Sequence, residues 1–176
     1  CAILLSPRSC LEATIATLSR IDPLTNVMNR RSIANQLEQL HQQRKALYSV
    51  VLLDLDHFKN INDQFGHSMG DQVLVNVAKC LANNLRDRDM IGRFGGEEFI
   101  LLLPNTTTEQ AQHVAERCRI ALTELNFVYE QQPFSISASF GISSSQNASE
   151  PQQIIRQADQ ALYAVKTAGR NQVQIY

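Results

Sequence analysis

Residues 90–104, MIGRFGGEEFILLLP, predict two strands joined by a tight turn. The adjacent glycines favour a hairpin loop, and the apolar run at residues 99–103 indicates that the second strand is buried. Glu97 and Glu98 lie where that second strand begins, a place at which a simple turn needs no carboxylate. We therefore take these two glutamates as candidate functional residues.

A second pair of carboxylates ends the strand predicted at residues 47–56, LYSVVLLDLD. Its continuous apolar run is typical of a strand buried on both faces, and α/β proteins commonly bind ligands at the carboxyl ends of such strands. Asp54 and Asp56 point to the same face because side chains alternate along a strand. If the hairpin lies beside this strand, Asp54 and Glu97 converge on one or two cations, and oxygen ligands suit Mg²⁺. For either acidic pair alone, capping a loop and solvating a strand end is the competing explanation.

Helices and strands alternate along the rest of the chain. Apolar residues recur at helical spacing in residues 32–44, 71–85, 107–125 and 150–169. Residues 127–143 predict two strands, the second alternating from Phe134 to Phe140, and residues 172–176 predict a closing strand. Residues 57–72 are polar and predict a turn and loop before the second helix. The fold class is therefore α/β (α+β), with one central mixed sheet flanked by helices.

The beginning of the chain differs in character. Residues 1–20 predict a linker or stalk helix, because apolar residues from Leu11 to Ile21 recur at helical spacing. Asp22-Pro23 favours a turn, and Asn26 suits a left-handed backbone position. The chain begins at Cys1 rather than Met, so we expect it to be part of a longer protein, with one domain at residues 21–176.

Composition excludes several classes of protein. The 176 residues include 16 Lys and Arg against 17 Asp and Glu, a balance that argues against a nucleic-acid partner. The four cysteines and four histidines show no metal-binding spacing, which favours free thiols in a reducing compartment. No apolar run approaches the roughly 20 residues that a membrane span needs.

Further polar residues suggest a nucleotide site. Lys59 lies in a polar turn at a predicted helix start, where a cation and backbone N–H groups bind phosphate well. Asn62 and Asp71 flank the Gly66-His67 loop and together offer the donor and acceptor groups that match a guanine edge. Lys166 and Arg170 lie four residues apart at the end of the last helix, where complementing the helix dipole is an equally good explanation.

The segment RFGGEEF resembles the GG[D/E]EF motif of the diguanylate cyclases. DPLTNVMNRR, DLDHFKNINDQFGHSMGD and ADQALYAVKTAGRN resemble the family's other conserved segments, in order and at suitable spacing, so that the resemblance covers about residues 21–176. It implies a palm-like sheet related to class III nucleotidyl cyclases. It also implies a bacterial signalling enzyme that joins two GTP into cyclic di-GMP and releases two pyrophosphates, with one GTP on each of two facing domains of a homodimer.

The resemblance also implies roles for individual residues. Metal binding, by two Mg²⁺ or alternatively Mn²⁺, falls to Asp54, Glu97 and the Leu55 carbonyl. Catalysis falls to Glu97 as proton acceptor and Lys59 as phosphate charge partner, while Glu98 acts as a base, as an outer ligand or by orienting Glu97. The substrate contacts are the guanine readers Asn62 and Asp71, His67 in the same loop, the phosphate contacts Lys166 and Arg170, the backbone at His57 and Phe58, and Gly95 and Gly96, which let the hairpin approach the nucleotide.

A product-inhibition site is implied by Arg86 and Asp89, which form an RxxD motif five residues before Gly95. Arg117, on the third predicted helix, falls where the family often has a secondary arginine of this site. An exposed, salt-bridged turn is the alternative explanation of RDRD. One departure from the family is Asn26 in place of a glycine, and asparagine tolerates a positive φ.

Three functions remain to be distinguished: an active, product-inhibited cyclase, a receptor that binds GTP or cyclic di-GMP without turnover, and a cyclase of another nucleotide. The first is favoured because no expected carboxylate or guanine reader is missing. We expect a cytoplasmic domain controlled by an upstream sensor, in a parent protein whose membrane anchoring the sequence leaves open.

Overall fold

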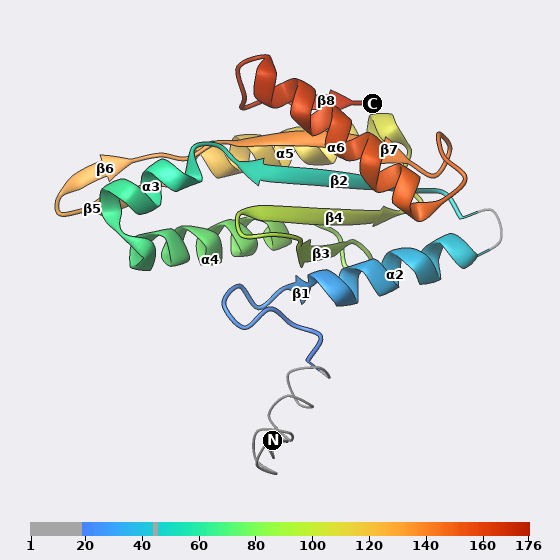
Figure 1. Cartoon of the computed structure of the whole chain (residues 1–176), viewed down its shortest axis with the longest axis horizontal. Coiled ribbons are helices and arrows are strands. Elements are labelled where there is room, and N and C mark those ends of the chain that lie inside the picture. Colours follow the sequence, from blue (N-terminus) through green and yellow to red (C-terminus); the bar gives the residue numbers. More distant parts are fainter. Residues whose placement is uncertain (1–18, 44–45) are drawn as a thin grey trace, which may run out of the picture.

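The computed structural model describes residues 19–43 and 46–176 (Figure 1). The stalk helix predicted for residues 1–20 falls almost entirely outside the described residues, as do Cys1 and Cys10. Cys80 and Cys118 lie inside them as free thiols. No helix in the described ranges is long and apolar enough to cross a membrane.

The central sheet is mixed and has six strands in the order β1-β3-β4-β2-β7-β8. Their bounds are β1 Met28–Asn29, β2 Tyr48–Leu55, β3 Met90–Arg93, β4 Glu98–Pro104, β7 Ala138–Ser144 and β8 Val173–Ile175. The pairs β1–β3 and β7–β8 are parallel, whereas β3–β4, β4–β2 and β2–β7 are antiparallel. The predicted fold class is confirmed, and β1, which pairs through only two residues, was not predicted.

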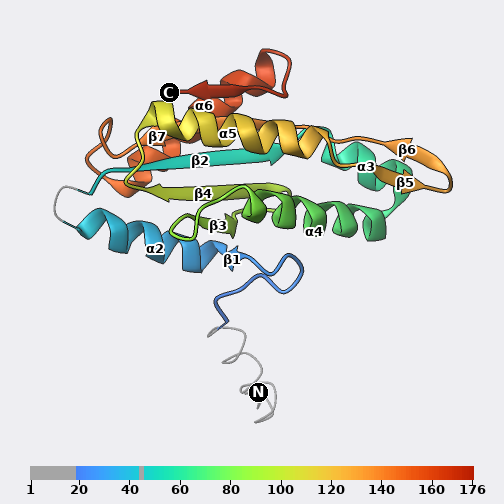
Figure 2. The same cartoon turned by 180° about the vertical axis from the view of Figure 1, so that it is seen from behind.

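Helices cover both faces of this sheet. The helices α2, Arg30–Gln42, and α6, Pro151–Thr167, pack on one face, and α4, His67–Asn83, and α5, Thr108–Thr123, pack on the other (Figures 1 and 2). Every residue of β2 is buried. Its Val50 and Leu52 join the apolar cluster beneath α2 and α6, while Val51 and Leu53 join the cluster beneath α4 and α5. Burial on both faces is therefore the reason for the continuous apolar run of β2.

One predicted loop and one predicted strand differ from the structure. Residues 57–72 do not form a loop, because α3 spans Phe58–Phe65 and α4 begins at His67, with Gly66 at φ 84° between them. The helix α3 buries Phe58 and Ile61.

The strand expected to run from Phe134 to Phe140 is also interrupted. Its first part forms β6, Gln132–Phe134, which pairs only with β5, Phe127–Tyr129. Positive φ angles at Glu130 and Gln131 turn the chain back on itself, and the resulting hairpin extends beside α3 at one end of the sheet (Figure 1). Its Phe134 stacks on Phe65 of α3, with ring centroids 4.5 Å apart.

Two predicted turns are confirmed. Asn26 has φ 58°, the left-handed conformation predicted for it. The last helix ends before Gly169, whose φ of 117° is one that other residues rarely adopt.

Candidate active site

The pairing of β2 with β4 brings two acidic segments together. Asp54 is the cross-strand partner of Glu98, and the Leu55 N–H donates to the Glu97 carbonyl at 3.3 Å. The hairpin therefore lies beside the first buried strand, as predicted. Its loop spans residues 94–97, so Glu97 ends the loop and Glu98 begins β4, one residue later than predicted.

Negative charge is concentrated where β2 ends and β4 begins. Burial raises the pKa of Asp54 above its usual value, and the nearby Lys166 ammonium opposes that rise. Burial also raises the pKa of Glu97, and the negative charges of Asp54 and Glu98 add to the increase. Since an ionised carboxylate is disfavoured in such a place, a bound cation would be favourable.

The donor set fits a hard divalent cation. Lys166 of α6 already contributes a positive charge, with its Nζ 3.0 Å from Asp54 Oδ2. Among the described residues no group of three or more His, Cys, Asp or Glu side chains is arranged to bind a metal ion. Asp54, Glu97 and the Leu55 carbonyl would therefore supply few ligands, which suits Mg²⁺ because it retains water and substrate phosphate ligands.

The positively charged side chains that are predicted to bind phosphate lie in different parts of the structure. Arg170, in the turn after α6, is close enough for its positive charge to oppose the rise in the pKa of Asp54, as the charge of Lys166 also does. Lys59 is exposed on α3. The first N–H groups of α3, which begins at Phe58 after a left-handed His57, have no partner within the helix, as at any helix start. Such N–H groups favour a bound anion.

The predicted guanine readers lie where α3 packs on α4. Asn62 Oδ1 is buried and has no hydrogen-bond partner in the described structure. A Cβ at Gly70 would overlap that oxygen, so the close packing requires glycine there. His67 and Asp71 are exposed in the first turns of α4. An unpaired buried acceptor is unfavourable, and a ligand with an N–H donor, such as a guanine edge, would satisfy it.

The two glycines of the hairpin loop differ. A Cβ at Gly95 would overlap the Glu98 carboxylate, which the prediction did not foresee. Nothing lies within 4 Å of the corresponding Cβ position at Gly96, which therefore leaves room for the predicted approach of a nucleotide.

An ion pair that the sequence analysis missed supports this loop. Arg93 donates to the Gly96 carbonyl at 2.8 Å and forms an ion pair with Asp22 at 3.2 Å. Asp22 also accepts a hydrogen bond from the Thr25 hydroxyl. The available sequence signal was the opposite charge of Asp22 in DPLTNVMNRR and Arg93 in RFGGEEF.

The predicted inhibition site is a turn between α4 and β3. The Arg86 N–H donates to Asp89 Oδ2 at 2.9 Å, and the Arg86 side chain is exposed. Arg117 extends from α5 to the same turn and donates to the Asn84 carbonyl at 2.6 Å. The structure thus brings the three predicted residues to one surface region.

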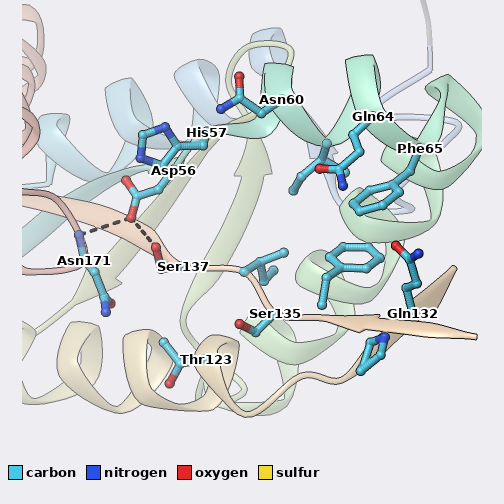
Figure 3. A pocket seen from close by; sticks show the side chains of 14 residues that line it. Asp56, His57, Asn60, Gln64, Phe65, Thr123, Gln132, Ser135, Ser137 and Asn171 are labelled. Atoms are coloured by element: carbon cyan, nitrogen blue, oxygen red, sulfur yellow. Dashed lines mark hydrogen bonds between the residues drawn. The ribbon is translucent and has the colours of Figure 1, made fainter.

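A pocket of about 590 Å³ lies on another side of α3, where Asp56, Gln64 and Gln132 are among its lining residues (Figure 3). Asp54, Asn62 and Glu97 do not line it. We place the candidate active site at the carboxylates, because charge and unpaired groups are concentrated there.

Solved structures share this fold. The fold matches SiaD of Pseudomonas aeruginosa, a diguanylate cyclase solved with its activator SiaC, with a TM-score of 0.86 and 35% identity over 96% of this chain and 66% of that one. It also matches the GGDEF domain of DgcB from Caulobacter crescentus, solved with c-di-GMP, with a TM-score of 0.85 and 28% identity over 89% and 95% of the chains. The fold is thus that of the diguanylate cyclase class of domains.

Sequence comparison identifies the family. A family model described as "Diguanylate cyclase, GGDEF domain" matches residues 19–172. Diguanylate cyclase DgcP of Pseudomonas aeruginosa is 42% identical over 158 residues, 88% of this chain and 23% of that protein. Probable diguanylate cyclase DgcT of Escherichia coli K12 is 40% identical over 95% of this chain and 38% of that protein. The chain belongs to the GGDEF family, and it spans well under half the length of these two relatives.

Proposed function

We propose that this domain is the catalytic domain of a diguanylate cyclase that condenses two GTP into cyclic di-GMP and releases two pyrophosphates. The observation that carries the proposal is the pairing of β2 with β4, which brings buried Asp54 and half-buried Glu97 close enough for the charge of Asp54 to raise the pKa of Glu97. The relatives named as diguanylate cyclases support the choice of reaction.

The chain's own residues have separate tasks in this proposal. Asp54, Glu97 and the Leu55 carbonyl would hold Mg²⁺, or Mn²⁺ in its place. The bound ions would supply positive charge that acidifies the ribose 3′-hydroxyl and neutralises the triphosphate. Lys59, Lys166 and Arg170, with the backbone N–H groups of His57 and Phe58, would bind the phosphates, and Asn62, His67 and Asp71 would orient the guanine.

In the bond-forming step the 3′-oxygen of one GTP attacks the α-phosphorus of the other, and pyrophosphate leaves in line. Glu97 is the candidate acceptor of the hydroxyl proton, but a carboxylate that also binds the cation is a weak base. Solvent is the alternative acceptor for the hydroxyl proton. Glu98, whose carboxylate packs against Gly95, fits an orienting role better than a direct one.

Assembly and regulation belong to the same proposal. Each domain would bind one GTP, so two domains must face one another. Cyclic di-GMP would inhibit by binding Arg86, Asp89 and Arg117, and an upstream sensor would control how two cytoplasmic domains meet. The DgcB domain solved with c-di-GMP supports product binding.

The test is incubation of the purified protein with GTP and Mg²⁺, followed by chromatography of the products. Cyclic di-GMP is the expected product. Retained nucleotide binding without any product, in a dimeric sample, would instead favour a receptor. Turnover of ATP in preference to GTP would indicate a cyclase of another nucleotide.

A further inference from the structure

Asp56 is a buried carboxylate to which the proposed function assigns no task. It directly follows β2, and only 6% of its surface is exposed. The Ser139 hydroxyl donates to its Oδ1 at 2.6 Å, and the Ser137 hydroxyl donates to its Oδ2 at 2.6 Å. The backbone N–H of Asn171 also donates to Oδ2, at 3.1 Å (Figure 3). Both oxygens are therefore used within the protein, although Asp56 lies only two residues from Asp54.

The turn that Asp56 contacts has an unusual backbone. Arg170 and Asn171 have φ angles of 66° and 47°, a left-handed conformation that asparagine tolerates but that is unfavourable for arginine. Such a conformation persists only where surrounding contacts fix it. One contact is the bond from the Arg170 N–H to the Val165 carbonyl, at 3.0 Å. The bond from Asn171 to Asp56 is the second.

Two contacts thus join the end of α6 and its following turn to the end of β2. Lys166 binds Asp54, and Asn171, five residues later, binds Asp56. Asp54 and Asp56 belong to one short segment, so the candidate cation site and the phosphate-binding turn share the same support. Asp56 also accepts from two serines at the start of β7, which fixes its carboxylate in the sheet.

We propose that Asp56 is a positioning residue for the cyclase reaction. By binding the Asn171 N–H, it places Arg170 and Lys166 against the segment that carries Asp54, so that the triphosphate meets both. The inference rests on the proposed function. A purely structural role would weaken binding of every ligand of the site equally, whereas a positioning role selectively weakens the binding of the terminal phosphates.

The experiment compares two probes by calorimetry in the presence of Mg²⁺. One is 3′-deoxy-GTP, which lacks the attacking hydroxyl and cannot react, and the other is GMP, which lacks the terminal phosphates. For Asp56→Ala we expect affinity for 3′-deoxy-GTP to fall by about 10-fold, since hydrogen bonds to charged groups are involved. Affinity for GMP should change by less than about twofold.

Three further variants sharpen the result. Asp56→Asn preserves the shape and an acceptor for Asn171 but loses the charge. Its affinity for 3′-deoxy-GTP should therefore lie between the affinities of the wild type and Asp56→Ala. In a double-mutant cycle with Arg170→Ala, the losses from Asp56→Asn should be non-additive. The matched control is Ser143→Ala, which removes a buried 2.7 Å hydrogen bond between β7 and Gln157 of α6 without contacting the turn.

The outcomes separate the two proposals. If wild-type protein binds neither probe, the proposed function fails and this inference fails with it. If wild-type protein binds both probes, three results would each overturn the positioning role alone. These are an equal loss of affinity for both probes in Asp56→Ala, additive losses of affinity in the double-mutant cycle, and a selective loss of affinity for 3′-deoxy-GTP in Ser143→Ala. Should Asp56→Ala fail to fold by circular dichroism, Asp56→Asn and its cycle decide the question.

Discussion

At the scale of single residues, Glu97 combines a proposed metal-binding role with an energetic cost. Its raised pKa means that the folded domain binds the proton more tightly than the unfolded chain does. The contribution of Glu97 to stability is therefore fully present below its unfolded pKa and is lost as pH rises through the raised folded pKa. A carboxylate that opposes folding at neutral pH is expected where a cation is normally bound.

Glu97→Gln should consequently melt at a higher temperature than the wild type at pH 7 in EDTA, and the difference should disappear at acidic pH. Cyclase activity should fall by more than about 100-fold, because a metal ligand is lost. Thermal denaturation followed by circular dichroism from pH 4 to pH 8 gives the stability, and product chromatography gives the activity. Glu130→Gln, at an exposed hairpin position, is the control. A Glu97→Gln melting temperature below that of the wild type at pH 7 would contradict the argument.

Arg86 offers a second prediction at this scale. Its side chain is exposed in the turn where Arg117 also ends, so Arg86→Ala should retain synthesis while raising the product concentration needed for half inhibition by about 10-fold or more. Arg88→Ala, an exposed residue of the same turn, is the matched control. Dose-response curves with added cyclic di-GMP measure the effect. Unchanged inhibition would remove the case for a regulatory site.

The site residues that could be predicted from sequence are those whose chemistry is visible locally. Asp54 ends a strand and Glu97 follows two glycines, so each residue could be identified locally. The pairing of β2 with β4, which brings the two segments together, was a condition of the prediction that the structure meets. The task of Asp56 could not be found in this way, because its partners Ser137, Ser139 and Asn171 lie 81, 83 and 115 positions further along the chain. The ion pair of Asp22 with Arg93 spans 71 positions and was missed for the same reason.

At the scale of elements, the contact of α6 with β7 determines where Lys166 lies. A Cβ at Gly141 would overlap the Ala158 carbonyl oxygen and the Leu162 backbone N, so the helix packs directly on the strand. These are backbone atoms, which cannot rotate away as a side chain can. The whole helix would have to move.

Gly141→Ala should therefore destabilise the domain by about 3 kcal/mol, as overpacking of a well-packed core does. It should also reduce activity, because α6 carries Lys166 away from Asp54. Urea denaturation measures the first effect and the GTP assay the second. Gly96→Ala is the control for stability, since nothing lies near its Cβ position. Equal stability of the two variants would show that α6 adjusts at no cost.

Element prediction succeeded where apolar periodicity was long and failed where it was short. The helices α2, α5 and α6 bury apolar residues at helical spacing, and the strands β2 and β4 bury continuous apolar runs. The helix α3 has only eight residues and buries Phe58 and Ile61, so its polar sequence resembled a loop. The turn that pairs β5 with β6 depends on the backbone at Glu130 and Gln131, and Phe134 of β6 stacks on Phe65 of α3, neither of which the period-two pattern reveals.

At the scale of the whole molecule, the order of the strands could not be derived from sequence. The chain places β2 between β4 and β7, and β1 beside β3, through pairings of segments distant in sequence. Composition predicted one folded domain, and the alternation of elements predicted a mixed sheet covered by helices. The candidate site forms at one end of the two central strands because neighbouring antiparallel strands bring the end of β2 and the start of β4 together.

The proposed reaction makes a prediction about assembly. One domain would hold one GTP, so product formed per domain should rise with protein concentration until dimers predominate, and then level off. Initial rates measured across a hundredfold range of concentration, beside sedimentation of the same samples, test this. A constant rate per domain in samples that sediment as monomers would refute the requirement for two facing domains.

The register of β2 against β4 has a consequence for how homologous domains lose catalytic activity during evolution. Leu53 opposes Phe99 in the interior, and the next pair along is Asp54 with Glu98. A slip of one position would move every side chain of β2 to the opposite face, where it would no longer fit the packing beneath the helices, so natural selection for folding alone preserves the alignment of the acidic pair. Homologues that lose enzymatic activity are then expected to lose individual acidic side chains while the register of the two strands persists. The retained site could then bind other ligands.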